Sequence, residues 1–200
     1  MNEIPQLTVM VLGPQGSGKG TQAKLLAEYL KKTDPSRGVI SFGAGDALRK
    51  FVRKGGYTQG IVAESLLRGE LLPLFVLGNV WSDFFIGSYN GKQHVIIDGF
   101  PRAENQLELF HSVIEFYGLK PIVVRLSLSQ ESAMKRLAAR GRSDDTPESI
   151  RQRVAWYDAN AESLLRWMRE RGQYRFLEVN GEPSPEAVHA DILEKLNLPR

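Results

Sequence analysis

The chain has 200 residues, no cysteine and a formal net charge of +3. This length suits one domain with small inserts. The lack of thiols excludes disulfides, cysteine nucleophiles and cysteine-ligated zinc or iron–sulfur sites. The balance of 26 basic and 23 acidic residues is too even to predict a nucleic-acid or membrane partner. No apolar run approaches the ~20 residues that cross a bilayer, and the first residues do not read as a signal peptide. We therefore expect a cytoplasmic protein.

Strand-like and helix-like segments alternate along the chain. Apolar, β-rich runs predict strands over residues 7–12, 38–42, 94–98, 121–126 and 175–179. Helical spacing predicts helices over 19–30, in several pieces over 44–88 with Pro73 in the first turn of one piece, and over 103–117, 131–140, 145–171 and 185–196. Asp145 is the expected N-cap of the helix at 145–171. This alternation predicts an α/β fold of three layers, α/β/α, with a central five-stranded parallel sheet. Ligands of such sheets sit at the carboxyl ends of the strands.

A glycine-rich loop between the first strand and the first helix carries the strongest functional signal. Residues 13–21 read Gly-Pro-Gln-Gly-Ser-Gly-Lys-Gly-Thr. Glycines let backbone N–H groups approach a phosphate chain, and the start of the helix adds a partial positive charge. Lys19 adds a full charge that suits the β- and γ-phosphates of a nucleotide. Gly20 separates Lys19 from the hydroxyl of Thr21, which usually follows the lysine directly.

An acid and a group of arginines point to the same chemistry. Asp98 ends the third predicted strand, where an acid that faces a phosphate-binding loop helps to hold Mg²⁺. Arg136 and Arg140 are four residues apart, so they share a helix face and can point at one phosphate chain. Arg142 lies on the short charged turn at 141–145. These arginines alone would also suit a solvated helix face, but beside Lys19 and Asp98 we favour an anion site.

Four segments together resemble the adenylate kinase family, and nucleoside monophosphate kinases more broadly. They are the loop at 13–22, Gly-Asp-Ala-Leu-Arg at 45–49, Asp-Gly-Phe-Pro-Arg at 98–102 and the arginines of 136–153. The resemblance implies a P-loop kinase fold in one domain over 1–200. Its core would span 1–42, 74–139 and 146–200, with a helical insert at about 43–73 that binds the nucleoside monophosphate (NMP) and a very short lid at about 140–145.

The resemblance also implies a role for individual residues. ATP would be bound by Gly16, Ser17, Gly18, Lys19, Gly20, Thr21, Arg136 and Gly181. AMP would be bound by Ala44, Arg49, Leu71, Leu72, Gly99, Arg102, Gln106, Arg142 and Arg153. Catalysis would fall to Lys19, Arg102, Arg136, Arg140, Arg142 and Arg153. Mg²⁺ would arrive with ATP and be held by Asp98, through water, and by Thr21, whereas the short cysteine-free turn at 141–145 leaves no place for zinc.

The proposed chemistry needs no general base. The second pKa of a nucleotide phosphate is ~6, so the acceptor oxygen is already largely ionised at neutral pH. Phosphoryl transfer then requires alignment, neutralisation of charge and exclusion of water. The three histidines, His94, His111 and His189, are accordingly expected at surface or edge positions. The tryptophans at 81, 156 and 167, with the phenylalanines at 84 and 85, are expected in core and hinge packing.

The identity of the acceptor rests on two conflicting residues. Ala44 stands where adenylate kinases usually carry threonine, and alanine there, like the turn at 141–145, resembles the UMP/CMP kinases. Gln106 matches the base-reading glutamine of adenylate kinases, whereas UMP/CMP kinases usually carry asparagine. An amide on the base edge discriminates by hydrogen bonds, so we favour Gln106 and therefore AMP. The loop also departs from the family at Gln15, where proline is common.

The expected reaction is therefore reversible, Mg-dependent transfer from ATP to AMP, giving two ADP. The alternatives are a UMP/CMP kinase that uses ATP, and a P-loop module that binds nucleotide without turnover. ATP and AMP are the expected partners of a monomer, with neither nucleic acid nor membrane involved.

Overall fold

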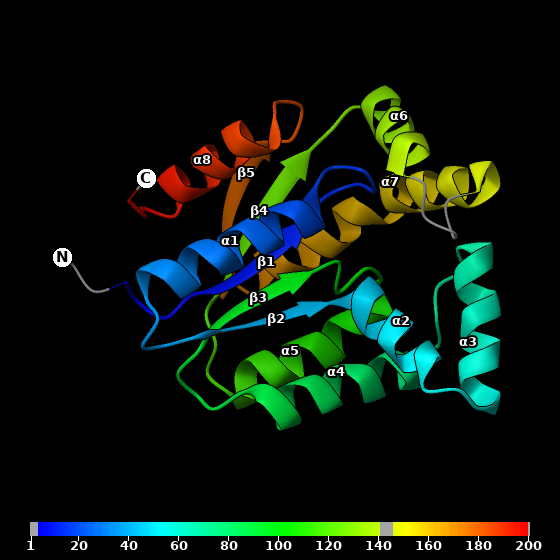
Figure 1. The fold of residues 1–200 in the computed structure, drawn as a ribbon, viewed down its shortest axis with the longest axis horizontal. Coiled ribbons are helices and arrows are strands. Elements are labelled where there is room, and N and C mark those ends of the chain that lie inside the picture. Colours follow the sequence, from blue (N-terminus) through cyan, green and yellow to red (C-terminus); the bar gives the residue numbers. More distant parts are fainter. Residues whose placement is uncertain (1–3, 141–145, 200) are drawn as a thin grey trace.

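Five parallel strands form the centre of the computed structural model, which describes residues 4–140 and 146–199 and, at 149 and 153, the backbone alone. They lie in the order β2-β3-β1-β4-β5 (Figure 1). Their bounds are β1 Thr8–Leu12, β2 Val39–Gly43, β3 His94–Asp98, β4 Pro121–Ser127 and β5 Arg175–Asn180. The predicted five-stranded parallel sheet is confirmed, with each strand within two residues of its expected bounds.

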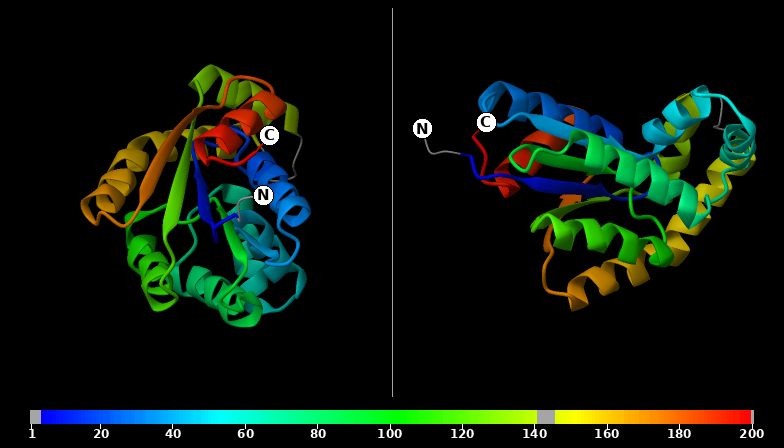
Figure 2. Two further views of the ribbon diagram at one scale, coloured as in Figure 1. Left: turned by 90° about the vertical axis from the view of Figure 1, so that its left-hand side faces the viewer. Right: turned by 90° about the horizontal axis from the view of Figure 1, so that it is seen from below.

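Helices cover both faces of this sheet. They are α1 Lys19–Thr33, α2 Ala44–Arg53, α3 Tyr57–Arg68, α4 Leu74–Ser88, α5 Leu107–Phe116, α6 Gln130–Arg140, α7 Pro147–Glu170 and α8 Pro185–Lys195, with a 3₁₀ turn at Glu104–Gln106. α1 and α8 pack on one face, and α4, α5 and the carboxyl half of α7 pack on the other (Figures 1 and 2). The three predicted layers are therefore present. None of the helices within the described ranges has the length and apolarity of a membrane span.

The alternation of side chains along each strand builds two separate cores. In β1, Val9 and Val11 point toward α1 and α8, whereas Met10 and Leu12 point toward α4, α5 and α7. The second core contains Trp81, which is fully buried and packs edge-to-face on Phe42 at 4.8 Å between ring centroids. Each large apolar side chain buried in this way contributes about 1.5–3 kcal/mol. Both cores thus fix the sheet from which the functional loops extend.

The carboxyl edge of the sheet gathers the loops that the sequence singled out. Asp98 pairs in register with Val11 of β1 on one side and with Gly43 of β2 on the other. The loop at 13–18, the start of α2 and the segment at 99–102 therefore leave the sheet side by side. α2, α3, α6 and the first turns of α7 all lie beyond this edge (Figure 1).

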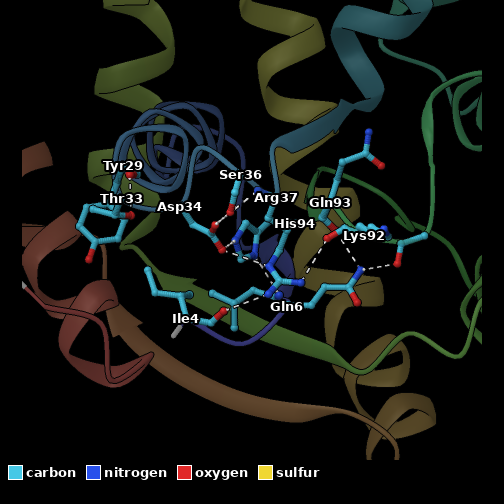
Figure 3. Close-up of polar contacts among 12 residues, drawn as sticks. Ile4, Gln6, Tyr29, Thr33, Asp34, Ser36, Arg37, Lys92, Gln93 and His94 are labelled. Atoms are coloured by element: carbon cyan, nitrogen blue, oxygen red, sulfur yellow. Dashed lines mark hydrogen bonds and ion pairs between the residues drawn. The ribbon is translucent and has the colours of Figure 1, made fainter. Parts of the chain in front are cut away.

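The amino edge of the sheet is closed by a polar network (Figure 3). The buried His94 accepts a hydrogen bond at Nδ1 from the backbone N–H of Leu7, at 3.1 Å. Its proton must therefore lie on Nε2, which donates to Asp34 Oδ2 at 3.2 Å. Asp34 also accepts from Ser36 Oγ and from Arg37 Nε, at 2.9 and 3.1 Å. The ring thus joins β3 and the residue before β1 to the turn after α1.

Some sequence expectations were wrong. His94 and His111 are buried rather than at the surface, because each finds a partner inside: Asp34 for His94, and the Tyr174 hydroxyl, at 2.9 Å, for His111. Pro73 precedes α4 as its N-cap instead of lying in its first turn. By contrast, the helix expected over 103–117 is confirmed to within one residue at each end, with a 3₁₀ first turn at Glu104–Gln106. The expected N-cap Asp145 lies outside the described residues.

Candidate active site

Two cavities meet at the carboxyl edge of the sheet. We call them the inner cavity, of about 440 Å³, and the loop cavity, of about 890 Å³. The inner cavity lies between the sheet edge, α2, α3 and α7, and the loop cavity follows the glycine-rich loop to the segment after β5. Six residues line both cavities: Gln15, Lys19, Gly45, Arg49, Arg102 and Arg140. The two cavities therefore share one strongly cationic wall.

The glycine-rich loop presents backbone N–H groups to the loop cavity. α1 begins at Lys19 after Gly18, which has a left-handed φ of 88° and no side-chain cap. The first N–H groups of a helix have no partner within the helix, so they form an anion site when no side chain caps them. Gly16 must also lack a side chain, because a β-carbon there would lie 2.9 Å from the carbonyl oxygen of Ala133. The buried Ser17 hydroxyl has no hydrogen-bond partner among the described residues.

Lys19 is held in the loop by its own backbone. Its Nζ donates to the carbonyl oxygens of Gly13 and Pro14, both at 2.7 Å. Burial lowers the pKa of Lys19 to about 7, although Asp98 opposes this shift, and the positive charges of Arg102 and Arg140 lower it further. A phosphate chain beside the ammonium would favour the charged form again.

Asp98 and Thr21 form the candidate metal site. A β-carbon at Gly20 would lie 3.2 Å from Asp98 Oδ2, so this carboxylate stands against the first turn of α1. Thr21 lines the same cavity. One carboxylate and one hydroxyl suit Mg²⁺, which commonly takes phosphate oxygens and water as its other ligands. Within the described residues, no cluster of three or more histidine, aspartate or glutamate side chains is arranged to hold a metal ion.

Arg102 and Arg49 are oriented by neighbours in the inner cavity. Arg102 Nε donates to the carbonyl oxygen of Gly99 at 2.8 Å, and its backbone N–H donates to Gln106 Oε1 at 2.8 Å. Gly99 has a left-handed φ of 69°, and a β-carbon there would lie 2.9 Å from Arg102 Nη2, so glycine is favoured at this position. Arg49 forms an ion pair with Asp46 one turn earlier in α2.

Arg136 is held by the segment that follows β5. Its Nη1 and Nη2 donate to the carbonyl oxygens of Gly181 and Glu182, both at 2.8 Å. Arg136 and Arg140 both line the loop cavity, and backbone acceptors after β5 hold the Arg136 guanidinium. That the two arginines point at one phosphate chain stays a prediction. The Glu182 carboxylate is fixed in turn by the backbone N–H of Ser129, at 2.8 Å. Arg136 therefore positions the wall of the loop cavity.

The structure brings most of the predicted site residues to one of the two cavities. The loop cavity is lined by Gly16, Ser17, Gly18, Lys19, Gly20, Thr21, Asp98, Arg136, Arg140 and Gly181. The inner cavity is lined by Lys19, Arg49, Leu71, Gly99, Arg102 and Arg140. Ala44, Leu72 and Gln106 are buried behind these linings. Arg142 lies outside the described residues, and Arg153 belongs to α7, but its side chain also falls outside the described part of the chain.

The sequence did not reveal the α7 wall of the inner cavity. Trp156, expected in core or hinge packing, is half-buried and lines this cavity together with Tyr157, Leu164 and Leu165. Leu48 of α2 and Leu66 of α3 face them across the cavity. The spacing of Trp156 and Leu164 shows that they share a helix face, but the direction of that face depends on how α7 crosses the sheet edge.

A strand, a phosphate-binding loop and a helix that begins at Lys19 place the protein in the phosphate-loop class of nucleotide-binding proteins. The chain belongs to the adenylate kinase family, because the family model described as "Adenylate kinase" matches residues 11–173. It is similar to an adenylate kinase of Phocaeicola vulgatus, at 29% identity over 94% of this chain and 96% of the relative. It is also similar to an adenylate kinase of Nitrobacter hamburgensis, at 33% identity over 95% and 92%. An adenylate kinase 1 of Synechocystis is 33% identical over 96% and 97%.

Proposed function

We propose that this protein is an adenylate kinase, which reversibly transfers the terminal phosphoryl group of ATP to AMP and gives two ADP. The family and the names of the relatives support this activity. The observation that carries it is the wall shared by the two cavities, in which every charged side chain is a cation. Two nucleotides that occupied the cavities would bring their phosphates together against Lys19, Arg102 and Arg140.

The loop cavity would hold ATP and the inner cavity AMP. Uncapped N–H groups at the start of α1 suit a phosphate chain. The inner cavity has an apolar side formed by α2, α3 and α7, which suits a nucleobase, and a cationic side at Arg49 and Arg102, which suits a single phosphate. We assign residues 43–73 to the NMP-binding insert and 140–145 to the lid. Arg142 and Arg153 remain proposed ligands.

Charge neutralisation would be the main catalytic contribution of the protein. The attacking oxygen of AMP is already ionised, so the side chains need not remove a proton from it. Lys19 and the arginines would offset the charge spread over the phosphoryl oxygens, in a site that must exclude water. Asp98, through water, and Thr21 would hold the Mg²⁺ that enters with ATP and that neutralises further phosphate charge. We also expect the protein to be a monomer that works in the cytoplasm.

AMP is favoured as acceptor over UMP or CMP. The similar relatives carry the name adenylate kinase. Gln106, proposed to read the base, is buried behind the lining of the inner cavity, where its Oε1 accepts a hydrogen bond from the backbone N–H of Arg102. Gln106 therefore also positions Arg102.

A coupled assay for ADP tests the proposal. MgATP serves as donor, and AMP, UMP, CMP, GMP and dTMP are each offered as acceptor. We expect turnover with AMP to exceed that with the other four by at least about a hundredfold, the range that site hydrogen bonds provide. A dominant signal with UMP or CMP would instead identify the protein as a UMP/CMP kinase. Folded protein that binds ATP but is silent with all five would be a nucleotide-binding module without turnover.

A further inference from the structure

Gln15 occupies a distinctive place in the wall that the two cavities share. Of the six residues that line both cavities, four are cations and Gly45 has no side chain, so Gln15 is the neutral polar one. We propose that the Gln15 amide donates a hydrogen bond to the phosphoryl group while it passes from ATP to AMP. This proposal deepens the proposed function and rests on it.

The backbone around Gln15 is fixed on both sides. The carbonyl oxygen of Pro14, immediately before it, accepts from Lys19 Nζ at 2.7 Å and from the backbone N–H of Ser17 at 3.2 Å. Gly16, immediately after it, lies against the backbone of Ala133, where a β-carbon would find its nearest atom at 2.9 Å. The loop therefore fixes where the Gln15 side chain starts, beside the wall that the two cavities share.

The Gln15 side chain is available for a ligand. It is half-buried, and it forms no hydrogen bond to another side chain or backbone group that the structure describes. Its amide offers two N–H donors and one oxygen acceptor. The oxygen can turn toward the neighbouring cations, which leaves the N–H groups to face an anion between the two cavities.

The chemistry of the transfer gives this donor its role. The bond between the γ-phosphorus and the bridging oxygen of ATP breaks, that oxygen leaves with the ADP, and a new bond forms to a phosphate oxygen of AMP. The negative charge in transit is spread over three phosphoryl oxygens. Gln15 neither gives up nor gains a proton. It would add a donor for one of these oxygens without adding another charge to the crowded cationic wall.

Two variants of Gln15 and one control distinguish the hydrogen bond of the amide from the size of the side chain. Gln15→Met keeps the size and removes the hydrogen bond, and Gln15→Glu keeps the size and places a carboxylate near the phosphoryl oxygens. Gln173→Met, at an exposed position on the opposite edge of the sheet, is the matched control. We expect Gln15→Met to lower kcat by about tenfold to a hundredfold, because a hydrogen bond to a charged group is lost. Gln15→Glu should lower kcat further, and Gln173→Met should match the unmodified chain. Thermal unfolding confirms that each variant is folded.

Binding measurements identify the state in which the contact is made. For Gln15→Met, the affinity for an analogue that joins two adenosines through five phosphates should fall by about the same factor as kcat. The affinity for ATP alone, and the KM for AMP, should change by less than about twofold.

Several results would overturn the proposal. Unchanged kcat in Gln15→Met would remove Gln15 from the reaction. A rise confined to the KM for AMP would make it a ligand of resting AMP, and equal losses of ATP and analogue affinity would make it a ligand of ATP. A Gln15→Glu variant as active as Gln15→Met would also contradict a donor role. Lack of ATP–AMP turnover in the unmodified chain would instead defeat the proposed function.

Discussion

The two edges of the sheet differ in how far their polar groups are hydrogen-bonded within the protein. At the amino edge, both ring nitrogens of His94 have partners, and Asp34 accepts from three side chains (Figure 3). At the carboxyl edge, Lys19 is half-buried beside Asp98, Arg102 and Arg140, and the Ser17 hydroxyl has no partner among the described residues. Polar groups that are hydrogen-bonded to one another stabilise the fold, whereas polar groups without such partners can bind a ligand. Changes at the two edges should therefore affect different properties.

The largest effect is expected at the carboxyl edge. Lys19→Met should lower kcat/KM for ATP and AMP by at least about a hundredfold, because the charge beside the transferring group is removed. Its midpoint of urea unfolding should be no lower than that of the unmodified chain, because burial disfavours the Lys19 ammonium. Lys31→Met, on the exposed last turn of α1, is the control for activity. Near-normal activity of Lys19→Met would contradict the assignment of the loop.

The converse effect is expected at the amino edge. His94→Ala should lower the free energy of unfolding by about 3 kcal/mol, because it opens a cavity and leaves the Leu7 N–H and Asp34 without their partner. Its kcat should stay within about twofold. His189→Ala should cost less, because the Nδ1 of His189 has no partner among the described residues. Urea unfolding measures the stability and the ADP assay measures the activity. A His94→Ala variant that loses activity but not stability would contradict the proposed difference between the two edges.

A smaller effect is expected on the stability of the fold at acidic pH. Burial lowers the pKa of His94, although Asp34 opposes this shift. The unfolded chain then binds more protons than the folded one below the ordinary pKa of ~6.5, so stability is complete above that pH and is lost as the pH falls toward the lowered value. His94→Gln should remove up to about 1.4 kcal/mol per pH unit of this slope. Burial also lowers the pKa of His189, so the double variant with His189→Gln should flatten the slope further. The slopes are obtained from unfolding free energies measured between pH 5 and 7.5. Equal slopes in the unmodified chain, the single variant and the double variant would show that neither histidine causes the pH dependence of stability.

The smallest effect is a proton taken up by ATP binding. With its pKa lowered to about 7, Lys19 is mostly neutral at pH 8, and a bound phosphate chain should restore its charge. Binding should therefore take up nearly one proton, and affinity should fall as the pH rises above about 7. Calorimetry at pH 8 in two buffers of different ionisation enthalpy measures the uptake. Lys19→Arg, which stays charged, should take up none, and equal uptake in both proteins would exclude Lys19 as the acceptor.

The sequence predicts features that are local in the chain. Strand periodicity and glycine positions define the sheet and the loop, because both depend on neighbouring residues. It does not predict contacts between distant segments. The burial of His94 depends on Leu7 and Asp34, the orientation of Arg136 depends on carbonyl groups some 45 residues away, and Trp156 reaches the inner cavity because of how α7 crosses the sheet edge.

Ile4 and Pro199 are both tied to the end of the molecule opposite the cavities. The carbonyl oxygen of Ile4 accepts from Arg37, at 3.5 Å, and that of Pro199 accepts from the Tyr29 hydroxyl at 2.9 Å. Both partners lie in the carboxyl half of α1 or in the turn after it, so the chain enters and leaves beside the amino edge (Figure 1). A tether, reporter or fused domain that continues from the described ends at Ile4 and Pro199 would start at the edge opposite the two cavities, so a protein immobilised in this way should keep both cavities open to solution.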